Sequence, residues 1–357
     1  MSSPLRNKTT LPPMQMCQCA WRGDVIKDHP EQWTLHLSED DIAELAQAAN
    51  AFLSADADIT HMTKANFRLD KLAEKVQLLQ QQLLGGLGFM LVKGLDVHAF
   101  SHEQLSAMFY GFGTHIGHAR MQNAKGHVLG HVRDLNLRSD DPNVRVYQTS
   151  ERQTFHTDSA DVVALLCLNK AKQGGESLLV SAVTVFNEMR ANAPELLACL
   201  MDPIATDRRG EIPVGMEPYF SIPVFNWFVD KLTVIYQRQY IDSAQRFDGA
   251  FRLSEQHVEA LDMFDQLCNS SKLHLRMQLE PGDMQFVYNH GLLHDRTAFV
   301  DFDSLKQRRH LLRLWLALPN DRELPPVFKE RYDAITVGER GGMALKNVQP
   351  CAPLWPD

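Results

Sequence analysis

The chain has 357 residues, of which 44% are hydrophobic and 22% charged, a composition typical of a globular enzyme that can bury a core without cross-links. The net charge of −8 and the absence of a basic tract disfavour binding to nucleic acid. No run of about 18 apolar residues predicts a membrane span, and the N-terminus lacks the apolar segment of a secretory signal.

The six cysteines are scattered, and only Cys17 and Cys19 lie close together. Their spacing does not give the paired C-x-x-C framework of a zinc site. We therefore expect free thiols and a cytoplasmic location. The sequence does not indicate what Cys17 and Cys19 do.

The N-terminal part of the chain is predicted to be helical. Residues 1–20 are expected to form a poorly ordered arm, and residues 21–357 a single domain with N-terminal helices and helical inserts. Ser38 and Asp41 have the spacing of a capping box and mark the start of a helix. Hydrophobic periodicity and stop signals predict helices at 37–53, 69–86 and 101–117 and a short buried strand at 88–95.

From about residue 120 onward, short apolar runs alternate with turn residues, a pattern that predicts many short strands. The predicted strands lie at 127–132, 144–149, 161–168, 177–182, 231–236, 274–279, 284–289 and 310–318. Two helical inserts are expected near 182–201 and 254–269. The order of elements favours a mainly β fold, a jelly-roll barrel with flanking helices.

A candidate metal site begins in "FHTD", where His156 and Asp158 are two residues apart. Residues i and i+2 of a strand face the same side, so both side chains could reach one ion. His294, in "VYNHGLLHDR", is a candidate third ligand from far along the chain. Two imidazoles and one carboxylate leave coordination positions open, which suits non-haem Fe(II) better than zinc.

Two arginines in "QRRHLLRLWLAL" suggest an anionic ligand. Arg309 and Arg313 are four apart in a predicted apolar strand and are expected to share a face. A buried guanidinium needs a partner, and no acidic residue lies nearby in this strand. A dicarboxylate that also chelates the metal would supply one.

These stretches, with "GGESLLVSA" and "PGDMQFVYNHGLLHDRTAF", resemble the TauD/TfdA family of Fe(II)- and 2-oxoglutarate-dependent dioxygenases in the clavaminate-synthase-like superfamily. The resemblance spans about 85–345. It implies a double-stranded β-helix (cupin-like) and cofactor Fe(II), with 2-oxoglutarate and O2 as co-substrates. It also implies the following roles: His156, Asp158 and His294 bind iron, Arg309 and Ser177 bind the distal carboxylate of 2-oxoglutarate, and Arg313 faces an acidic group of the substrate.

Several residues keep two interpretations. Asp161 could meet the substrate or cap a turn, and Ser177 could be a turn hydroxyl. Gln122 and Asn123 could line the pocket or satisfy a loop backbone. The stretch 218–228 could form a lid or pocket wall, or an ordinary packed hairpin. Arg208-Arg209-Gly210 is most simply a solvated turn.

The resemblance implies an oxygenase that hydroxylates an unactivated C–H bond of a small anionic or amino-acid-like substrate and releases succinate and CO2. Two alternatives remain open: a biosynthetic oxidase of the same family that cyclises or desaturates, and a non-catalytic jelly-roll binding protein. A small-molecule substrate is the expected partner, without nucleic acid or membrane, and a homo-oligomer is possible.

Overall fold

The computed structural model describes residues 11–138, 144–213, 215–332, 334–343 and 347–355. The predicted N-terminal elements are confirmed with small shifts of their ends. Ser38 and Asp41 cap the second helix reciprocally, through side chain and backbone. These elements are α2 (Glu39–Ser54), α3 (Ala73–Gly85), β2 (Phe89–Lys93) and α4 (His102–Ile116).

The larger of two facing sheets runs in the order β1-β2-β14-β6-β17-β3, with β4 also paired to β17. Its centre is the antiparallel set β14, β6 and β17, all buried apolar strands. The bounds are β1 Thr34–His36, β3 His118–Ala119, β4 Gly130–Val132, β6 Val162–Asn169, β14 Met284–Tyr288 and β17 His310–Ala317.

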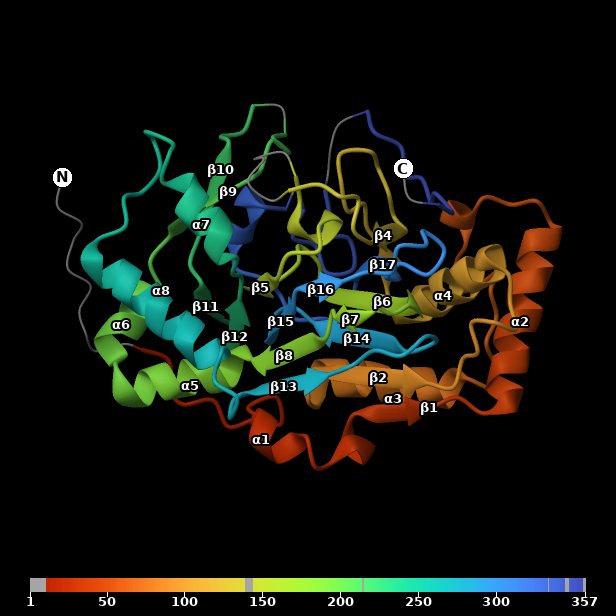
Figure 1. Cartoon of the computed structure of the whole chain (residues 1–357). Coiled ribbons are helices and arrows are strands. Elements are labelled where there is room, and N and C mark those ends of the chain that lie inside the picture. Colours follow the sequence, from red (N-terminus) through yellow and green to blue (C-terminus); the bar gives the residue numbers. More distant parts are fainter. Residues whose placement is uncertain (1–10, 139–143, 214, 333, 344–346, 356–357) are drawn as a thin grey trace.

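The smaller sheet has the order β13-β8-β15-β5 and carries most of the candidate site. Its strands are β5 (Gln153–His156), β8 (Ser177–Ser181), β13 (His274–Met277) and β15 (Leu292–Arg296). With the larger sheet it forms the jelly roll that the sequence predicts. The predicted inserts appear as α5 (Ala182–Asn192), α6 (Pro194–Cys199) and α8 (Glu255–Cys268), which lie beside the smaller sheet in Figure 1.

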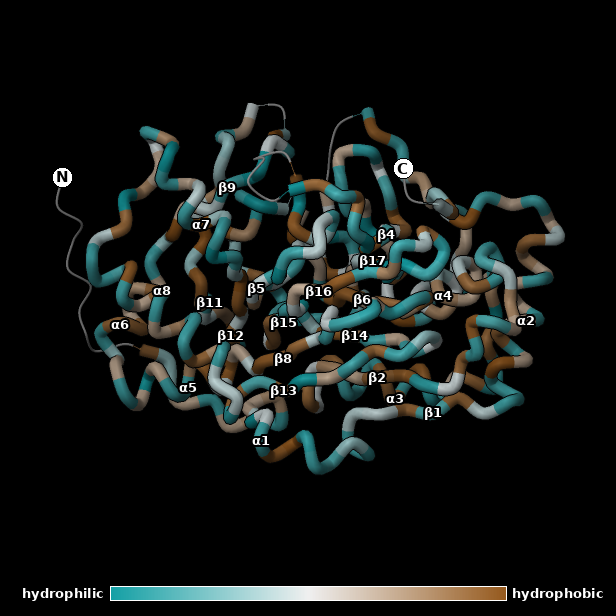
Figure 2. The backbone as a smooth tube through the Cα atoms, in the orientation of Figure 1, coloured by the Kyte–Doolittle hydropathy of each residue, from teal (hydrophilic) through white to brown (hydrophobic). Residues whose placement is uncertain are grey.

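Three apolar clusters hold these layers together. One packs α2, α3 and α4 against the larger sheet, and a second packs α5, α6 and α8 against the smaller sheet. The third lies between the sheets and includes Phe89, Val163, Leu179 and Trp315. Hydrophobic stretches recur along the central strands in Figure 2, as this sandwich requires.

The remaining described elements are short helices, strands and 3-10 turns. They are α1 (Gly23–Ile26), α7 (Arg238–Ala244), β7 (Gln173–Gly174), β9 (Ile204–Asp207), β10 (Tyr219–Ile222), β11 (Phe225–Phe228), β12 (Lys231–Val234), β16 (Phe299–Val300) and the 3-10 turns η1 (Pro30–Gln32), η2 (Ile59–His61), η3 (Val146–Gln148) and η4 (Pro326–Glu330). The single-domain organisation of 21–357 stays our proposal; it is supported by a larger sheet whose strands run from Thr34 to Ala317.

Two local predictions are wrong. The stretch 144–149, predicted as a strand, contains η3, because Thr149 and Gln148 turn back to bond the chain three residues earlier. Residues 11–20 are not a loose arm, since Pro12 and Gln15 hydrogen-bond to α5. Residues 1–10 of that predicted arm lie outside the described residues.

The expectation of free thiols fails at one pair, because Cys17 and Cys19 form a disulfide. Cys167, Cys199 and Cys268 are free, buried thiols, and Cys351 donates from Sγ to the Lys125 carbonyl oxygen. None of the helices in the described part of the chain has the length and apolar character needed to cross a bilayer. The cytoplasmic location stays a prediction.

Candidate active site

The predicted metal ligands converge between the two sheets. His156 is the last residue of β5 and pairs in register with His294 on β15. Asp158 lies two residues beyond β5, and its two carboxylate oxygens are each 3.8 Å from the Nε2 atom of one histidine. One potential ligand atom from each residue lies within 4.8 Å of the others. This is a compact set of two imidazoles and one carboxylate on one side of a possible ion.

The charge state of these three groups suits metal binding. Burial lowers the pKa of His156, and burial together with His156 lowers the pKa of His294 to about 3. Burial alone would raise the pKa of Asp158, but Arg313 and the two imidazoles outweigh it and lower that pKa to about 2. At neutral pH the set is therefore two neutral imidazoles and a carboxylate, the protonation state that a metal requires.

Neighbouring groups fix the orientation of the ligands. The Nδ1 atom of His156 is 2.8 Å from the carbonyl oxygen of Thr154, which leaves Nε2 to face Asp158. Trp315 donates its indole N–H to Asp158 Oδ2 at 2.7 Å. The backbone N–H of Asp158 donates to Asn289. The carboxylate is thus held although it lies outside regular structure.

Arg309 lies directly before β17, at a cavity that also contains Ser177, His294 and Asp158. It is 5% exposed, and its Nη1 atom has no hydrogen-bond partner among the described residues. Burial lowers the pKa of Arg309 to about 10, so it remains a cation at neutral pH. A buried guanidinium with an unpaired N–H indicates space for an anionic ligand.

Ser177 begins β8 and donates its hydroxyl to Gln285 at 3.0 Å, in the same cavity as Arg309. Arg313, on β17, donates from Nη1 to Asp158 at 3.4 Å and from Nε to Gln122 at 2.7 Å. Gln122, Arg313, His156 and Asp158 line a second, neighbouring cavity, whereas Asn123 lines a further pocket. The two site cavities meet at His156 and Asp158.

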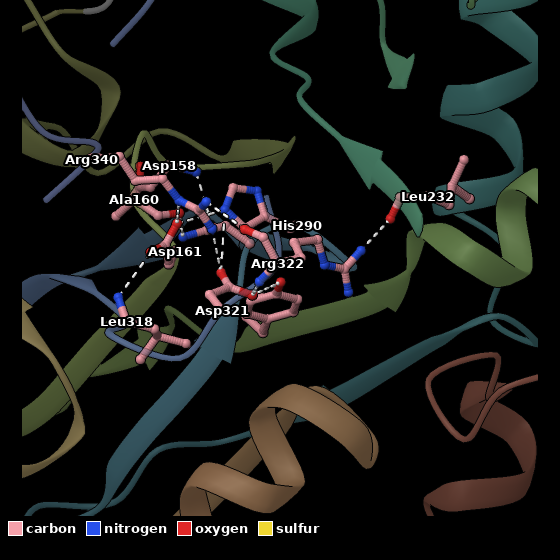
Figure 3. A network of polar contacts seen from close by, with 11 residues as sticks. Asp158, Ala160, Asp161, Leu232, His290, Leu318, Asp321, Arg322 and Arg340 are labelled. Carbon is pink, nitrogen blue, oxygen red and sulfur yellow. Dashed lines mark hydrogen bonds and ion pairs between the residues drawn. The ribbon is translucent and has the colours of Figure 1, made fainter. Parts of the chain in front are cut away.

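Asp161 is not brought to the cavities. It is fully buried, and its carboxylate accepts hydrogen bonds from Arg340, the Leu318 backbone N–H and, at 2.7 Å, His290 Nε2. Arg340 also bonds Asp321, so a cation side chain lies between the two carboxylates (Figure 3). The prediction that Asp161 meets the substrate is therefore wrong, because the core takes up both of its oxygens.

Sequence reasoning missed several residues of the site. Gln153 and Tyr147 line both cavities, and Arg296 lines the Arg309 cavity with two unpaired guanidinium nitrogens. Trp315 could have been found, since it follows Arg313 by two residues on the same strand. Phe220 of the 218–228 stretch lines the second cavity, so this stretch contributes to the pocket wall. It is not a hairpin, because β10 pairs with β9 and β11 with β12.

Fold and site together define a non-haem iron oxygenase of the jelly-roll class. Residues 55–315 match the family described as Taurine catabolism dioxygenase TauD, TfdA family. The chain belongs to this family, as its motifs predict. It is a dioxygenase whose cofactors are Fe(II) and 2-oxoglutarate.

One curated relative is FR-33289 synthase of Streptomyces rubellomurinus, 32% identical over 309 residues, or 85% of this chain and 91% of the relative. A structure of asparagine oxygenase with Fe(II), hydroxyasparagine and succinate superposes with a TM-score of 0.62 at 15% identity, covering 80% of this chain and 93% of the other. The non-haem iron oxygenase OrfP with Fe and alpha-ketoglutaric acid has a TM-score of 0.59 at 12% identity, over 79% and 93%. These similarities confirm the predicted fold.

Proposed function

We propose that the protein hydroxylates a C–H bond of a small anionic or amino-acid-like substrate, with conversion of 2-oxoglutarate and O2 to succinate and CO2. One oxygen atom of O2 enters the product and the other enters succinate. The observation that carries the proposal is the convergence of His156, Asp158 and His294 where two cavities meet. Arg309 lines one of these cavities and Arg313 lines both. Asparagine oxygenase and OrfP were solved with hydroxylated amino acids, which supports this substrate class.

We assign each side chain a role that its contacts allow. His156, Asp158 and His294 would hold Fe(II), and the bound ion with 2-oxoglutarate would supply the oxidising chemistry. Arg309 and Ser177 would bind the distal carboxylate of 2-oxoglutarate. Arg309 offers an unpaired, buried N–H, and the hydroxyl of Ser177 can rotate away from Gln285.

Arg313 would have two functions. It already neutralises Asp158, and it faces the second cavity with its guanidinium over the rings of Tyr147 and Trp315, 4.7 and 5.1 Å from their centroids. A guanidinium stacked in this way keeps its orientation and can present N–H groups to a substrate anion.

Anaerobic addition of Fe(II) and 2-oxoglutarate tests the cofactor sites. A weak visible charge-transfer band is expected for the wild type and should vanish in Asp158→Ala. Arg309→Ala should weaken 2-oxoglutarate binding by at least about 10-fold, since it removes a charge-assisted bidentate contact. Arg308→Ala is a matched control, because Arg308 is the adjacent arginine and bonds a loop carbonyl outside the cavity.

Succinate release tests the reaction. Amino acids and small anions are screened for substrates that stimulate it, and the product is weighed by mass spectrometry. A gain of one oxygen atom supports hydroxylation, and a loss of two hydrogens would refute it in favour of desaturation or cyclisation. A wild type with neither band nor succinate under any condition would sink the enzyme assignment at this site.

A further inference from the structure

The cavity beyond Arg313 is lined by three further arginines from three separate segments: Arg145, Arg208 and Arg331. We propose that this group, here called the arginine cluster, binds a doubly charged tetrahedral oxyanion on the substrate, a phosphate monoester or a phosphonate. The inference rests on the proposed function, because it names the substrate class of the same site.

Arg208 and Arg331 are neighbours. Arg208 bonds the backbone carbonyl of Glu330, the residue directly before Arg331. Both guanidinium carbons lie over the ring of Phe220, at 5.4 and 5.6 Å from its centroid. Two cations share one aromatic platform, which fixes their planes relative to each other.

The cluster is joined to the metal end of the cavity. Arg331 donates from Nε to the hydroxyl of Ser159 at 2.9 Å, and Ser159 follows the metal-ligand residue Asp158. His156, Asp158 and Arg313 line the same cavity. A substrate whose anionic group binds the cluster would therefore extend toward the metal ligands.

No carboxylate in the described part of the chain forms an ion pair with Arg208 or Arg331, since none lies within 4 Å of either guanidinium. Arg208 is 3% exposed; within the described ranges it bonds carbonyl oxygens alone and keeps a buried Nη1 without a partner. The buried Asp207 pairs instead with Arg246.

Electrostatics favours a dianion over a monoanion. Burial and then Arg331 lower the pKa of Arg208 to about 10, and burial and then Arg145 lower the pKa of Arg331 to about 10. Both remain charged at neutral pH and repel each other. Arg145 is already paired with Glu211, which leaves Arg208 and Arg331 as the two charges of the cluster without a carboxylate partner among the described residues. A carboxylate or sulfonate neutralises one, whereas a phosphate or phosphonate can neutralise both and offers three acceptor oxygens to two guanidinium groups.

Calorimetric titration of the anaerobic Fe(II)–2-oxoglutarate complex with four anions tests this inference by comparing their binding affinities. The probes are methyl phosphate, methylphosphonate, methanesulfonate and acetate. At pH 7.5 we expect the two dianions to bind at least 10-fold more tightly than the two monoanions. The advantage of methyl phosphate should shrink at pH 5, below its second pKa of about 6. Equal affinities, or no change with pH, would overturn the proposal.

Variants locate the binding. Arg208→Gln and Arg331→Gln should each weaken methyl phosphate and methylphosphonate binding at least 10-fold, whereas Arg276→Gln, which removes an exposed arginine of β13, should not. Retention of the Fe(II)–2-oxoglutarate band shows that a variant is folded. Wild-type affinity in both folded variants would refute the assignment.

Two outcomes separate this inference from the proposed function. Absence of the band in the wild type would refute the proposed function itself. A normal band with no preference for dianions would refute only the arginine cluster as an oxyanion site. Succinate release stimulated by alkyl phosphonates but not by alkyl phosphates, or the reverse, would identify which dianion the substrate carries.

Discussion

Replacement of Arg340 by methionine is expected to destabilise the protein by about 4 kcal/mol, within the range of about 3–5 kcal/mol for breaking a buried ion pair from one side. Arg340 has no exposed surface and donates to Asp161 at 2.7 Å, to Asp321 at 2.6 Å and to the Arg322 carbonyl at 2.6 Å (Figure 3). Methionine fills much of the volume but leaves two buried carboxylates without their cation. The free energy of unfolding is measured by urea titration with tryptophan fluorescence.

The pH dependence gives a second readout for Arg340→Met. His290 and Arg340 outweigh burial and lower the pKa of Asp161 in the wild type. Without the guanidinium, one of the two lowering influences is lost and the pKa of Asp161 rises, so the variant loses less stability than the wild type as the pH falls. The difference in unfolding free energy between Arg340→Met and the wild type should therefore become smaller between pH 7 and pH 4.5.

Controls define what would refute this reasoning. Arg276→Met breaks an exposed pair with Glu176 and should cost no more than about 1 kcal/mol. Adding Asp321→Asn to Arg340→Met should recover part of the loss, because it removes one uncompensated charge. A loss below about 1 kcal/mol for Arg340→Met, or no recovery in the double variant, would contradict the charge argument.

Three further predictions concern stability and metal binding. Burial and His131 lower the pKa of His310 to about 3, so at pH 5 the unfolded state binds more protons at this residue than the folded state. Between pH 7 and pH 5, His310→Gln should therefore lose about 2 kcal/mol less unfolding free energy than the wild type, and parallel plots of unfolding free energy against pH would contradict this. Trp315→Phe removes the N–H donor to the metal ligand and should weaken Fe(II) binding about 10- to 100-fold in a competition titration; unchanged affinity would refute its positioning role. Gly282→Ala places a Cβ 1.8 Å from a backbone carbonyl oxygen at φ +94° and should cost more than about 1 kcal/mol in thermal unfolding, whereas Gly85→Ala, with open space, should not.

The metal ligands could be predicted from residue type and order, but the geometric reason was only partly right. β5 ends at His156, so Asp158 reaches the ion from a loop and not as the next residue of a strand face. Likewise Arg309 directly precedes β17, so it is not a residue of the same strand as Arg313, although both side chains line the Arg309 cavity as expected. In both pairs, His156 with Asp158 and Arg309 with Arg313, the side chains come together through tertiary packing and not through the alternation of residues along one strand.

Other residues could not be predicted, because their partners are far away in sequence. Asp161 begins the predicted strand 161–168, and its partner Arg340 is 179 residues downstream. Arg208 lies in a charged turn sequence, but it is buried under the segment around Glu330. The sequence indicated a solvated turn for Arg208 and a substrate contact or turn cap for Asp161, and contacts made only in the folded chain bury both side chains.

The position of β5 has a consequence for how the fold opens. β5 is the terminal strand of the smaller sheet, and such edge strands separate most readily in local opening. His156 and His294 face each other across the β5–β15 pair, 138 residues apart in the chain, so an ion held by both fastens this edge and closes a long loop. Since the ion binds only the closed arrangement, loading raises the free energy of opening. Slower hydrogen exchange of the β5 amides would then report iron occupancy directly, without any turnover.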